Sequence, residues 1–390
     1  MTETTIMQTD ILIVGAGPVG MTLALTLGSS AWRTALVDRR PRGSFADDPR
    51  ALALSHGARQ LLEPLGAWNT AAATAIADIH ISQRGGFGRT QITASEHRLP
   101  ALGYVMRYRD LAAALDRQLA AESILDDSEI IAIEKHAESI RVTIQRNGTR
   151  LHIDTRLLVH AEGTPGNDPD VEVRDYRQHA VLAEVRPLPA HGNRAWERFT
   201  PEGPLALLPL GDEYSVVFTV PTERADKLMA LDDDAFLAAL QAQFGNAGST
   251  PLRFEKTTPR ARFPLALRQR KHLVAAREAW IGNAAQTLHP ISGQGFNLGL
   301  RDAFELGQIL GHPSCNDPGD SSRLARYERL RQLDRRGGAL FTDSIVRLFS
   351  NDLPPLRHAR GLGLMLLDLC PPARKFVSGR MLWGARAWPW

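Results

Sequence analysis

The chain has 390 residues, of which 43% are hydrophobic and 23% charged, and its formal net charge is +3. This length suffices for a sizeable buried core, and we expect two intertwined domains. Two cysteines, Cys315 and Cys370, are too few for a disulfide scaffold and favour a reducing, cytoplasmic compartment. We expect no signal peptide in the polar first nine residues, no membrane span, and no metal site, because neither cysteine lies in a pattern of metal ligands.

A glycine-rich turn follows the first apolar run. Residues 11–14 predict a buried parallel strand, and Gly15, Gly17 and Gly20 follow in a G-x-G-x-x-G spacing. The first two glycines permit a tight turn and the close approach of a pyrophosphate, and Gly20 lets the next helix pack on the sheet. A second strand ends at Asp38, where a carboxylate accepts hydrogen bonds from a ribose. A chance turn would need the strand, the helix and the acid to coincide, so the pattern predicts a bound dinucleotide.

Strand and helix patterns then alternate up to residue 160. A helix is expected over residues 55–65, and strands over 76–84 and 90–99, where apolar and polar residues alternate. A stripe of leucines between residues 104 and 121 indicates a helix. Three further strands are expected over residues 130–134, 140–146 and 151–160.

From about residue 171 the patterns are typical of an antiparallel sheet. The expected strands are 179–186, 195–199, 206–209 and 214–220. A helix capped near Asp232 should run to Phe244. Arg198 and Phe199 are neighbours on one strand, so strand alternation predicts that only one of them faces a pocket on the sheet.

A second glycine-rich loop lies late in the chain. A short strand pattern ends at Ile281, and after the loop a helical pattern begins near Gly295. Backbone N–H groups at such a helix start bind an anion or a polarised ring edge. Two loops of this kind, far apart in sequence, imply a large cofactor with two ends. The residues after 320 are expected to be mainly helical.

The sequence resembles the FAD-dependent aromatic hydroxylases of the ubiquinone-biosynthesis family over nearly its whole length. The resemblance rests on the first glycine motif with Asp38, the segment 50–54 (RALAL), the segment 161–163 (AEG), and the run 282–299 (GNAAQTLHPISGQGFNLG). It implies an α/β fold: a Rossmann-like FAD-binding domain, an inserted antiparallel β-sheet substrate domain and a helical C-terminal region. The implied bounds are 1–75, 104–170 and 271–320 for the first, 76–103 and 171–270 for the second, and 321–390 for the third.

The resemblance also implies the reaction. NAD(P)H would reduce FAD, and one oxygen atom of dioxygen would be transferred to a polyprenylated phenol. The runs 194–200 (RAWERFT) and 203–209 (GPLALLP) are similar to those of members that hydroxylate 2-polyprenyl-6-methoxyphenol para to its hydroxyl. Another ring position, another small aromatic, or a non-catalytic FAD-bound scaffold in a quinone-biosynthesis assembly are the alternatives.

Site residues follow by the same resemblance. The expected FAD contacts are Gly15, Gly17, Gly20, Asp38, Arg50, Arg109, Glu162, Asn283, Gly293, Gln294, Gly295 and Asn297. Most members carry Asp at the positions of Glu162 and Asn283; Asn283 still suits a ribityl hydroxyl, whereas Glu162 is alternatively a solvated acid. Arg50 and Arg109 are alternatively surface charges. No strong catalytic dyad stands out. His289 either shuttles a proton, binds the phenol oxygen or is structural, and Pro290 shapes the loop against the flavin ring.

Positive charge gathers at the end of the chain. Residues 356–390 contain six Arg or Lys and one Asp, together with Trp383, Trp388 and Trp390. No nucleic-acid-binding motif accompanies them, so we expect contact with the inner face of the cytoplasmic membrane and no nucleic-acid partner. The competing interpretation places these tryptophans in a core or a subunit interface.

Overall fold

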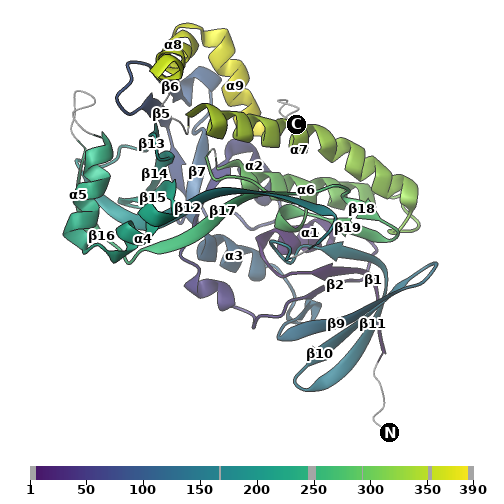
Figure 1. The fold of residues 1–390 in the computed structure, drawn as a ribbon. Helices are drawn as coiled ribbons and strands as arrows, with labels where there is room; N and C mark the ends of the chain where they lie inside the picture. The colour runs from purple at the N-terminus through teal and green to yellow at the C-terminus, as the bar shows by residue number, and fades with distance from the viewer. Residues whose placement is uncertain (1–5, 167, 245–251, 292, 350–353, 385–390) are drawn as a thin grey trace.

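The computed structural model describes residues 6–166, 168–244, 252–291, 293–349 and 354–384 (Figure 1). Trp388 and Trp390 therefore lie outside the described residues. Two large sheets, one small sheet between them and a helical C-terminal region make up the described chain.

The first sheet is built on parallel strands. Its order is β18 (Val274–Ala275), β19 (Glu278–Trp280), β11 (Thr149–His160), β1 (Ile6–Val14), β2 (Thr34–Val37) and β8 (Ile124–Leu125), and the hairpin β9 (Ser128–Lys135) and β10 (Ile140–Arg146) joins it through β11. Ile11, Leu12 and Ile13 are fully buried, as expected of a central parallel strand covered on both faces. The carboxyl ends of β1, β2, β11 and β19 meet at one edge, which is where open α/β sheets bind ligands.

Two helices are locked together against this sheet. α1 (Pro18–Leu27) and α6 (Gln294–Leu310) each begin at a glycine-rich loop and pack side by side (Figure 1). A Cβ atom at Gly307 would lie 2.5 Å from Thr26 Cγ2, and one at Gly299 would lie 3.0 Å from Val19 Cγ2. Because these two positions carry no side chain, the helices approach closely. The packed pair α1 and α6 therefore fixes the two glycine-rich loops relative to each other.

The second sheet has one covered face. Its order is β20 (Gln286–Thr287), β17 (Ala261–Arg270), β12 (Val171–Leu188), β15 (Glu213–Pro221), β14 (Pro204–Leu210), β13 (Arg194–Phe199), β5 (Asp78–Gln83) and β6 (Arg89–Thr93), with β16 (Arg253–Thr257) on β12. The helices α4 (Thr222–Ala230) and α5 (Asp233–Phe244) cover one face around Phe218, Phe236 and Leu240 (Figure 1). The other face is turned toward the remainder of the protein.

A small sheet and the C-terminal helices close the structure. The small sheet, β3 (Ala51–Ser55), β7 (Gly103–Arg107) and β4 (Thr74–Ile76), packs on the second sheet through Val105, Ala195 and Leu210. After α7 (Ser321–Phe349), α8 (Pro354–Leu369) covers β5 and β6, and α9 (Pro371–Trp383) packs on α2 (His56–Leu62) (Figure 1). Trp383 packs with Leu102 and Leu382, so this tryptophan belongs to a core.

The expected fold class is confirmed: the fold is α/β with an antiparallel second sheet and a helical C-terminal region. Asp232 accepts a hydrogen bond from Ala235 N (2.8 Å), as a cap of α5 should. One expected helix is shorter, because the chain first forms β7 and only then α3 (Tyr108–Asp116). The helix α4 was not anticipated. The proposed domain bounds stay a prediction.

Candidate active site

The first glycine loop separates two kinds of glycine. Gly15 has φ of 107°, and a Cβ atom there would lie 2.4 Å from Ala161 O; one at Gly20 would lie 2.0 Å from Gly15 O. These two glycines are needed for the turn and for the close approach of the 161–163 loop. At Gly17, the N-cap of α1, a Cβ atom would meet only Tyr108 Oη at 3.5 Å. Backbone at the positive end of α1 therefore faces open space beside Tyr108.

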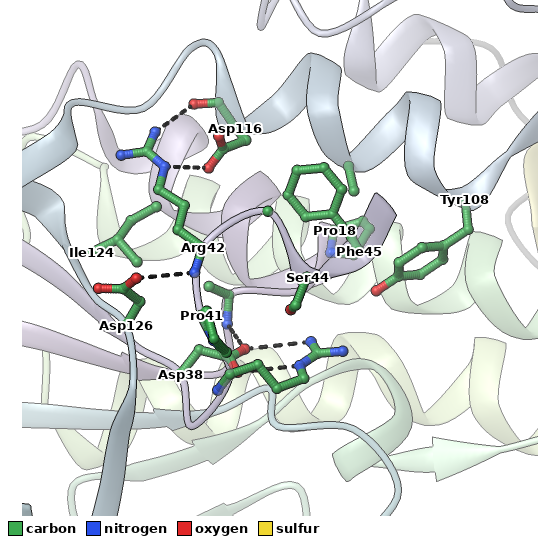
Figure 2. Close-up of a pocket in the computed structure, with 14 residues that line it drawn as sticks. Pro18, Asp38, Pro41, Arg42, Ser44, Phe45, Tyr108, Asp116, Ile124 and Asp126 are labelled. Atoms are coloured by element: carbon green, nitrogen blue, oxygen red, sulfur yellow. Dashed lines mark hydrogen bonds and ion pairs between the residues drawn. The ribbon is translucent and has the colours of Figure 1, made fainter. Parts of the chain in front are cut away.

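Asp38 is held at the rim of a pocket beside this loop. Its Oδ2 accepts a hydrogen bond from Ala16 N (2.8 Å), and its Oδ1 accepts one from Arg40 N (2.9 Å). Ser44, Phe45 and Tyr108 lie around the same opening (Figure 2). The carboxylate is thus fixed by backbone at the end of β2, where a ribose would be expected.

Two of the predicted arginines have different surroundings. Arg50 pairs with Asp48 (Nη2 to Oδ2 2.5 Å), and its guanidinium carbon lies 4.5 Å from the centre of the Tyr108 ring. Arg50 therefore brings positive charge close to the open backbone at Gly17. Arg109 is exposed on α3, and no ion pair of this side chain occurs within the described ranges.

The second glycine loop runs from β19 to α6. Gly293 is the N-cap of α6 with φ of 61°, and its N–H donates to Pro290 O (2.9 Å), so this N–H already has a protein partner. At Gly295, in the first turn, a Cβ atom would meet no atom of the described residues within 4 Å. Gly295 is therefore the position where the start of α6 presents bare backbone to open space. The Gln294 side-chain amide donates to Met381 O of α9 (3.2 Å).

Asn297 ties this loop to the small sheet. Its Oδ1 accepts a hydrogen bond from Ser55 N (2.8 Å), and its Nδ2 donates to Ala53 O and Gly293 O (both 2.9 Å). The side chain is buried and satisfied by backbone, so its position gives it a bracing role. Asn283, in the short 3-10 turn Gly282–Ala284, is exposed.

Glu162 belongs to a charged network that the sequence did not reveal. Its Oε1 lies 3.3 Å from His160 Nδ1, and His160 Nε2 lies 3.2 Å from Glu278 Oε1. The other carboxylate oxygen of Glu278, Oε2, pairs with Lys135. The His160 ring stacks on Trp280 with centroids 4.6 Å apart. Burial opposes protonation, but the hydrogen bonds to the two glutamates prevail and raise the pKa of His160 to about 8. A cation therefore sits beneath the 161–163 loop at neutral pH.

His289 is buried and neutral. Its Nδ1 accepts a hydrogen bond from Ile291 N (3.2 Å), whereas Nε2 has no partner within the described part of the chain. Its ring meets that of Tyr176 edge-on at 5.1 Å, and burial lowers the pKa of His289 to about 4. A neutral imidazole with one unsatisfied nitrogen suits hydrogen bonding to a ligand better than proton transfer near neutral pH.

The two faces of β13 behave as alternation predicts. Arg198 is buried on the face covered by α5. Its Nε donates to Gln243 O of α5 (2.6 Å), and its Nη1 donates to Ser82 Oγ of the neighbouring strand β5 (3.0 Å). Phe199 packs on the other face with Ile291 of the second glycine loop and Leu364 of α8. That face of the second sheet is therefore turned toward the loop.

A strip of half-buried side chains crosses this face. Strand register aligns its members in one row: Ile81, Glu197, Ala206, Val217 and Leu182. Toward one side Phe199 packs on the loop, and toward the other Ala195 packs on the small sheet. The strip lies between two packed clusters, and all but one of its members are aliphatic.

Comparisons with known proteins decide the family. Residues 8–336 match the FAD binding domain family. The chain belongs to this family. It is 30% identical over 382 residues to a protein of Rhodospirillum rubrum named ubiquinone hydroxylase UbiL, covering 94% of this chain and 87% of that one. It is also 30% identical over 379 residues to the 3-demethoxyubiquinol 3-hydroxylase of Escherichia coli K12, covering 92% and 95%.

Solved structures agree on the fold. The p-nitrophenol 4-monooxygenase of Pseudomonas putida DLL-E4 superposes with a TM-score of 0.76 at 14% identity, covering 98% of this chain and 99% of that one. The flavin-dependent halogenase CmlS superposes with a TM-score of 0.72 at 15% identity, covering 96% and 72%. The protein is an FAD-dependent aromatic-ring monooxygenase with NAD(P)H and dioxygen as co-substrates.

The residues present fit FAD. The open backbone at Gly17 beside Arg50 and Tyr108 suits a pyrophosphate, and Asp38 suits the neighbouring ribose. The open backbone at Gly295 suits the polar edge of the flavin ring. The structure brings these elements to one edge through direct contacts: Gly15 lies against the 161–163 loop, and a Cβ atom at Gly293 would touch Ala53, three residues after Arg50.

Proposed function

We propose that the protein hydroxylates a polyprenylated phenol in ubiquinone biosynthesis, with 2-polyprenyl-6-methoxyphenol as the substrate and the new hydroxyl para to the existing one. The observation that carries this proposal is the half-buried aliphatic strip facing the second glycine loop. It offers an apolar wall for a ring and its prenyl chain, with Glu197 as the one polar member. The names of the relatives support the substrate class.

The chain's own residues supply binding and orientation. When bound and reduced by NAD(P)H, FAD supplies the chemistry that activates dioxygen for insertion of one oxygen atom into the ring. Backbone at Gly295 stabilises negative charge at the flavin edge. Phe199, packed on Ile291 of the loop, excludes water from the strip and holds the phenol ring in place.

The product identifies the reaction. Cells that lack the protein should accumulate the methoxylated polyprenyl phenol in their lipid extract, and the purified enzyme should incorporate one atom of labelled dioxygen into it. Accumulation of a precursor without the methoxy group would point to an earlier ring position. A protein that binds FAD but shows no phenol-stimulated NAD(P)H oxidation would be a scaffold.

A lipid-dissolved substrate also requires a route from the bilayer. Leu362, Met365, Leu366 and Leu369 are exposed at three- and four-residue spacings on one side of α8, with Leu369 70% exposed. Phe87, 59% exposed between β5 and β6, lies against the same helix, where its ring stacks on His358 at 6.3 Å. We call Phe87 and these four residues the apolar ridge. Within the described residues, no helix has both the length and the apolar character to span a bilayer.

The charge around the apolar ridge favours an anionic lipid surface. Four exposed cations lie on the elements that carry or flank it: Arg84, Arg89, Lys375 and Arg380. The acids of the same region are occupied, since Asp368 Oδ1 accepts a hydrogen bond from Gln91 N (3.0 Å) and Glu96 pairs with Arg374. Apolar side chains ringed by cations bind at the headgroup level of anionic membranes. We therefore propose that the apolar ridge of α8 docks on the inner face of the membrane.

A further inference from the structure

Glu197 stands on the face of β13 that is turned toward the second glycine loop. Its neighbours Trp196 and Arg198 belong to the opposite face, where Trp196 meets the ring of Phe244 and Arg198 bonds to Gln243 O. Phe199, two residues further on, packs on Ile291 of the loop. Because side chains two apart on a strand share a face, Glu197 points to the same side as Phe199.

The surroundings of this carboxyl are apolar. Its register partners are Ile81 on β5 and Ala206 on β14. Oε1 is inaccessible to solvent and has no hydrogen-bond partner within the described ranges. A buried polar atom without a partner is costly to keep, and such groups in native proteins commonly serve a ligand. Glu197 is the acid that the strip presents toward the expected substrate.

The other ionisable groups on this side leave Glu197 without a counter-ion. His289 of the loop is neutral near pH 7. Further along the same face Glu184 is paired with Arg107 (Nε to Oε1 2.9 Å), and Glu213 shares a hydrogen bond with Glu184. Arg198 lies on the opposite face. Burial raises the pKa of Glu197 to about 7, which suits a group that exchanges a proton near neutral pH.

We propose that Glu197 is the catalytic residue that accepts the proton of the phenol hydroxyl. This inference rests on the proposed function. As the proton passes to the carboxylate, the electron pair of the phenol oxygen enriches the ring at the para carbon. There a new bond forms to one oxygen atom of dioxygen as the O–O bond breaks, and the second oxygen atom leaves as water. That carbon then loses its hydrogen as a proton, and Glu197 returns its own proton to the phenolate oxygen. Overall, the phenol, dioxygen, NAD(P)H and a proton give the hydroxylated phenol, NAD(P)⁺ and water.

The test compares Glu197→Gln with the wild type on a 2-methoxyphenol that carries a short 6-prenyl chain. For the wild type, kcat/KM should rise with pH through about 7, and in the variant this rise should vanish while kcat falls by about a hundredfold or more. FAD content, measured by flavin absorbance, should be unchanged. Glu255→Gln, at an exposed glutamate of β16 in the same sheet, is the matched control and should keep the wild-type profile.

A second measurement does not depend on turnover. Because the pKa of Glu197 is raised from 4.5 to about 7 in the folded protein, its contribution to stability is fully present below about pH 4.5. That contribution is lost as pH rises through about 7. The melting temperature of Glu197→Gln should therefore equal that of the wild type at acidic pH and exceed it at alkaline pH. An unchanged pH profile in an active Glu197→Gln enzyme would overturn the assignment. If the wild type hydroxylates a different phenol, the substrate proposal fails, and the same comparison on that phenol still decides the role of Glu197.

Discussion

At the scale of single residues, the glycines of the two loops fall into two groups. Gly15 and Gly20 are required by backbone contacts within the protein, because a Cβ atom at either position would lie within 2.4 Å of a carbonyl oxygen. Gly17 and Gly295 have no such requirement. A Cβ atom at Gly17 would make only an ordinary van der Waals contact, and one at Gly295 would meet no atom of the described residues within 4 Å. The space at Gly17 and Gly295 is therefore available to the cofactor.

Gly17→Val and Gly295→Val should fold and lose FAD. Each added side chain occupies the space where backbone would meet the cofactor, and a Cβ atom at either position does not collide with the described residues. The absorbance ratio of flavin to protein after purification measures the loss, and circular dichroism checks the fold. Gly337→Val, at a helical glycine of α7 with open space around it, is the control and should stay fully yellow. Full flavin content in both loop variants would show that these loops do not bind FAD.

His160 makes stability depend on pH. Its pKa is raised from 6.5 to about 8, so its contribution is fully present below about 6.5 and is lost as pH rises through 8. This shift corresponds to about 2 kcal/mol. Denaturant unfolding of His160→Gln should show a loss of up to that size near pH 6 and a smaller one near pH 9. His272→Gln, at an exposed histidine, is the control and should not show this pH-dependent loss of stability. If His160→Gln lost the same free energy of unfolding at both pH values, the charged network would be refuted.

At the scale of elements, α8 has one buried face and one exposed apolar face. Leu364 is buried against Phe199 and Ile291, while the apolar ridge on the other side is exposed. The helix that would meet lipid therefore also closes one end of the strip.

Leu366→Glu with Leu369→Glu should weaken binding to vesicles that contain anionic lipid. Each charge adds a desolvation cost to an apolar surface and opposes the lipid charge, and added salt should weaken the wild type further, at roughly 1 kcal/mol per basic residue near the surface. Co-sedimentation measures the effect. Leu333→Glu is the matched control, because Leu333 on α7 is 71% exposed and Leu369 is 70% exposed. If the double variant bound vesicles as well as Leu333→Glu does, membrane docking by the apolar ridge would be rejected. If the double variant lost a protein partner while its vesicle binding was unchanged, the apolar ridge would be assigned to a protein interface.

Elements with a local signal were predicted well from the sequence. The hairpin β9–β10 and strand β11 match their expected ranges within a few residues, since alternating side chains and turn residues define them. The strand β7 was merged into a helix because its conformation depends on pairing with β3, about fifty residues earlier along the chain. The apolar stretch of residues 362–369 is visible in the sequence, but the side of α8 that forms the apolar ridge could not be predicted, since exposure depends on which side meets β5 and β6.

At the scale of the whole molecule, the two glycine motifs predicted the cofactor, because each motif is continuous in sequence. The substrate face could not be predicted in the same way. Glu197 is placed by the register of five strands from distant parts of the chain, and His160 is charged only because Glu162 and Glu278 converge on it. The three backbone partners of the Asn297 amide could not be predicted either, because the fold brings them together from separate segments. The expected contact of Asn297 with FAD stays a prediction.

The close contact of α1 and α6 bears on how this architecture diversifies. Because Gly299 and Gly307 let the two helices touch, the span between the cofactor-binding loops is set by their packing and does not depend on the long segment between them. The second sheet, whose strands all lie within that segment, can therefore change in sequence while the packed pair of helices keeps its spacing. New substrate preferences can thus evolve by module replacement, with the redox machinery inherited intact.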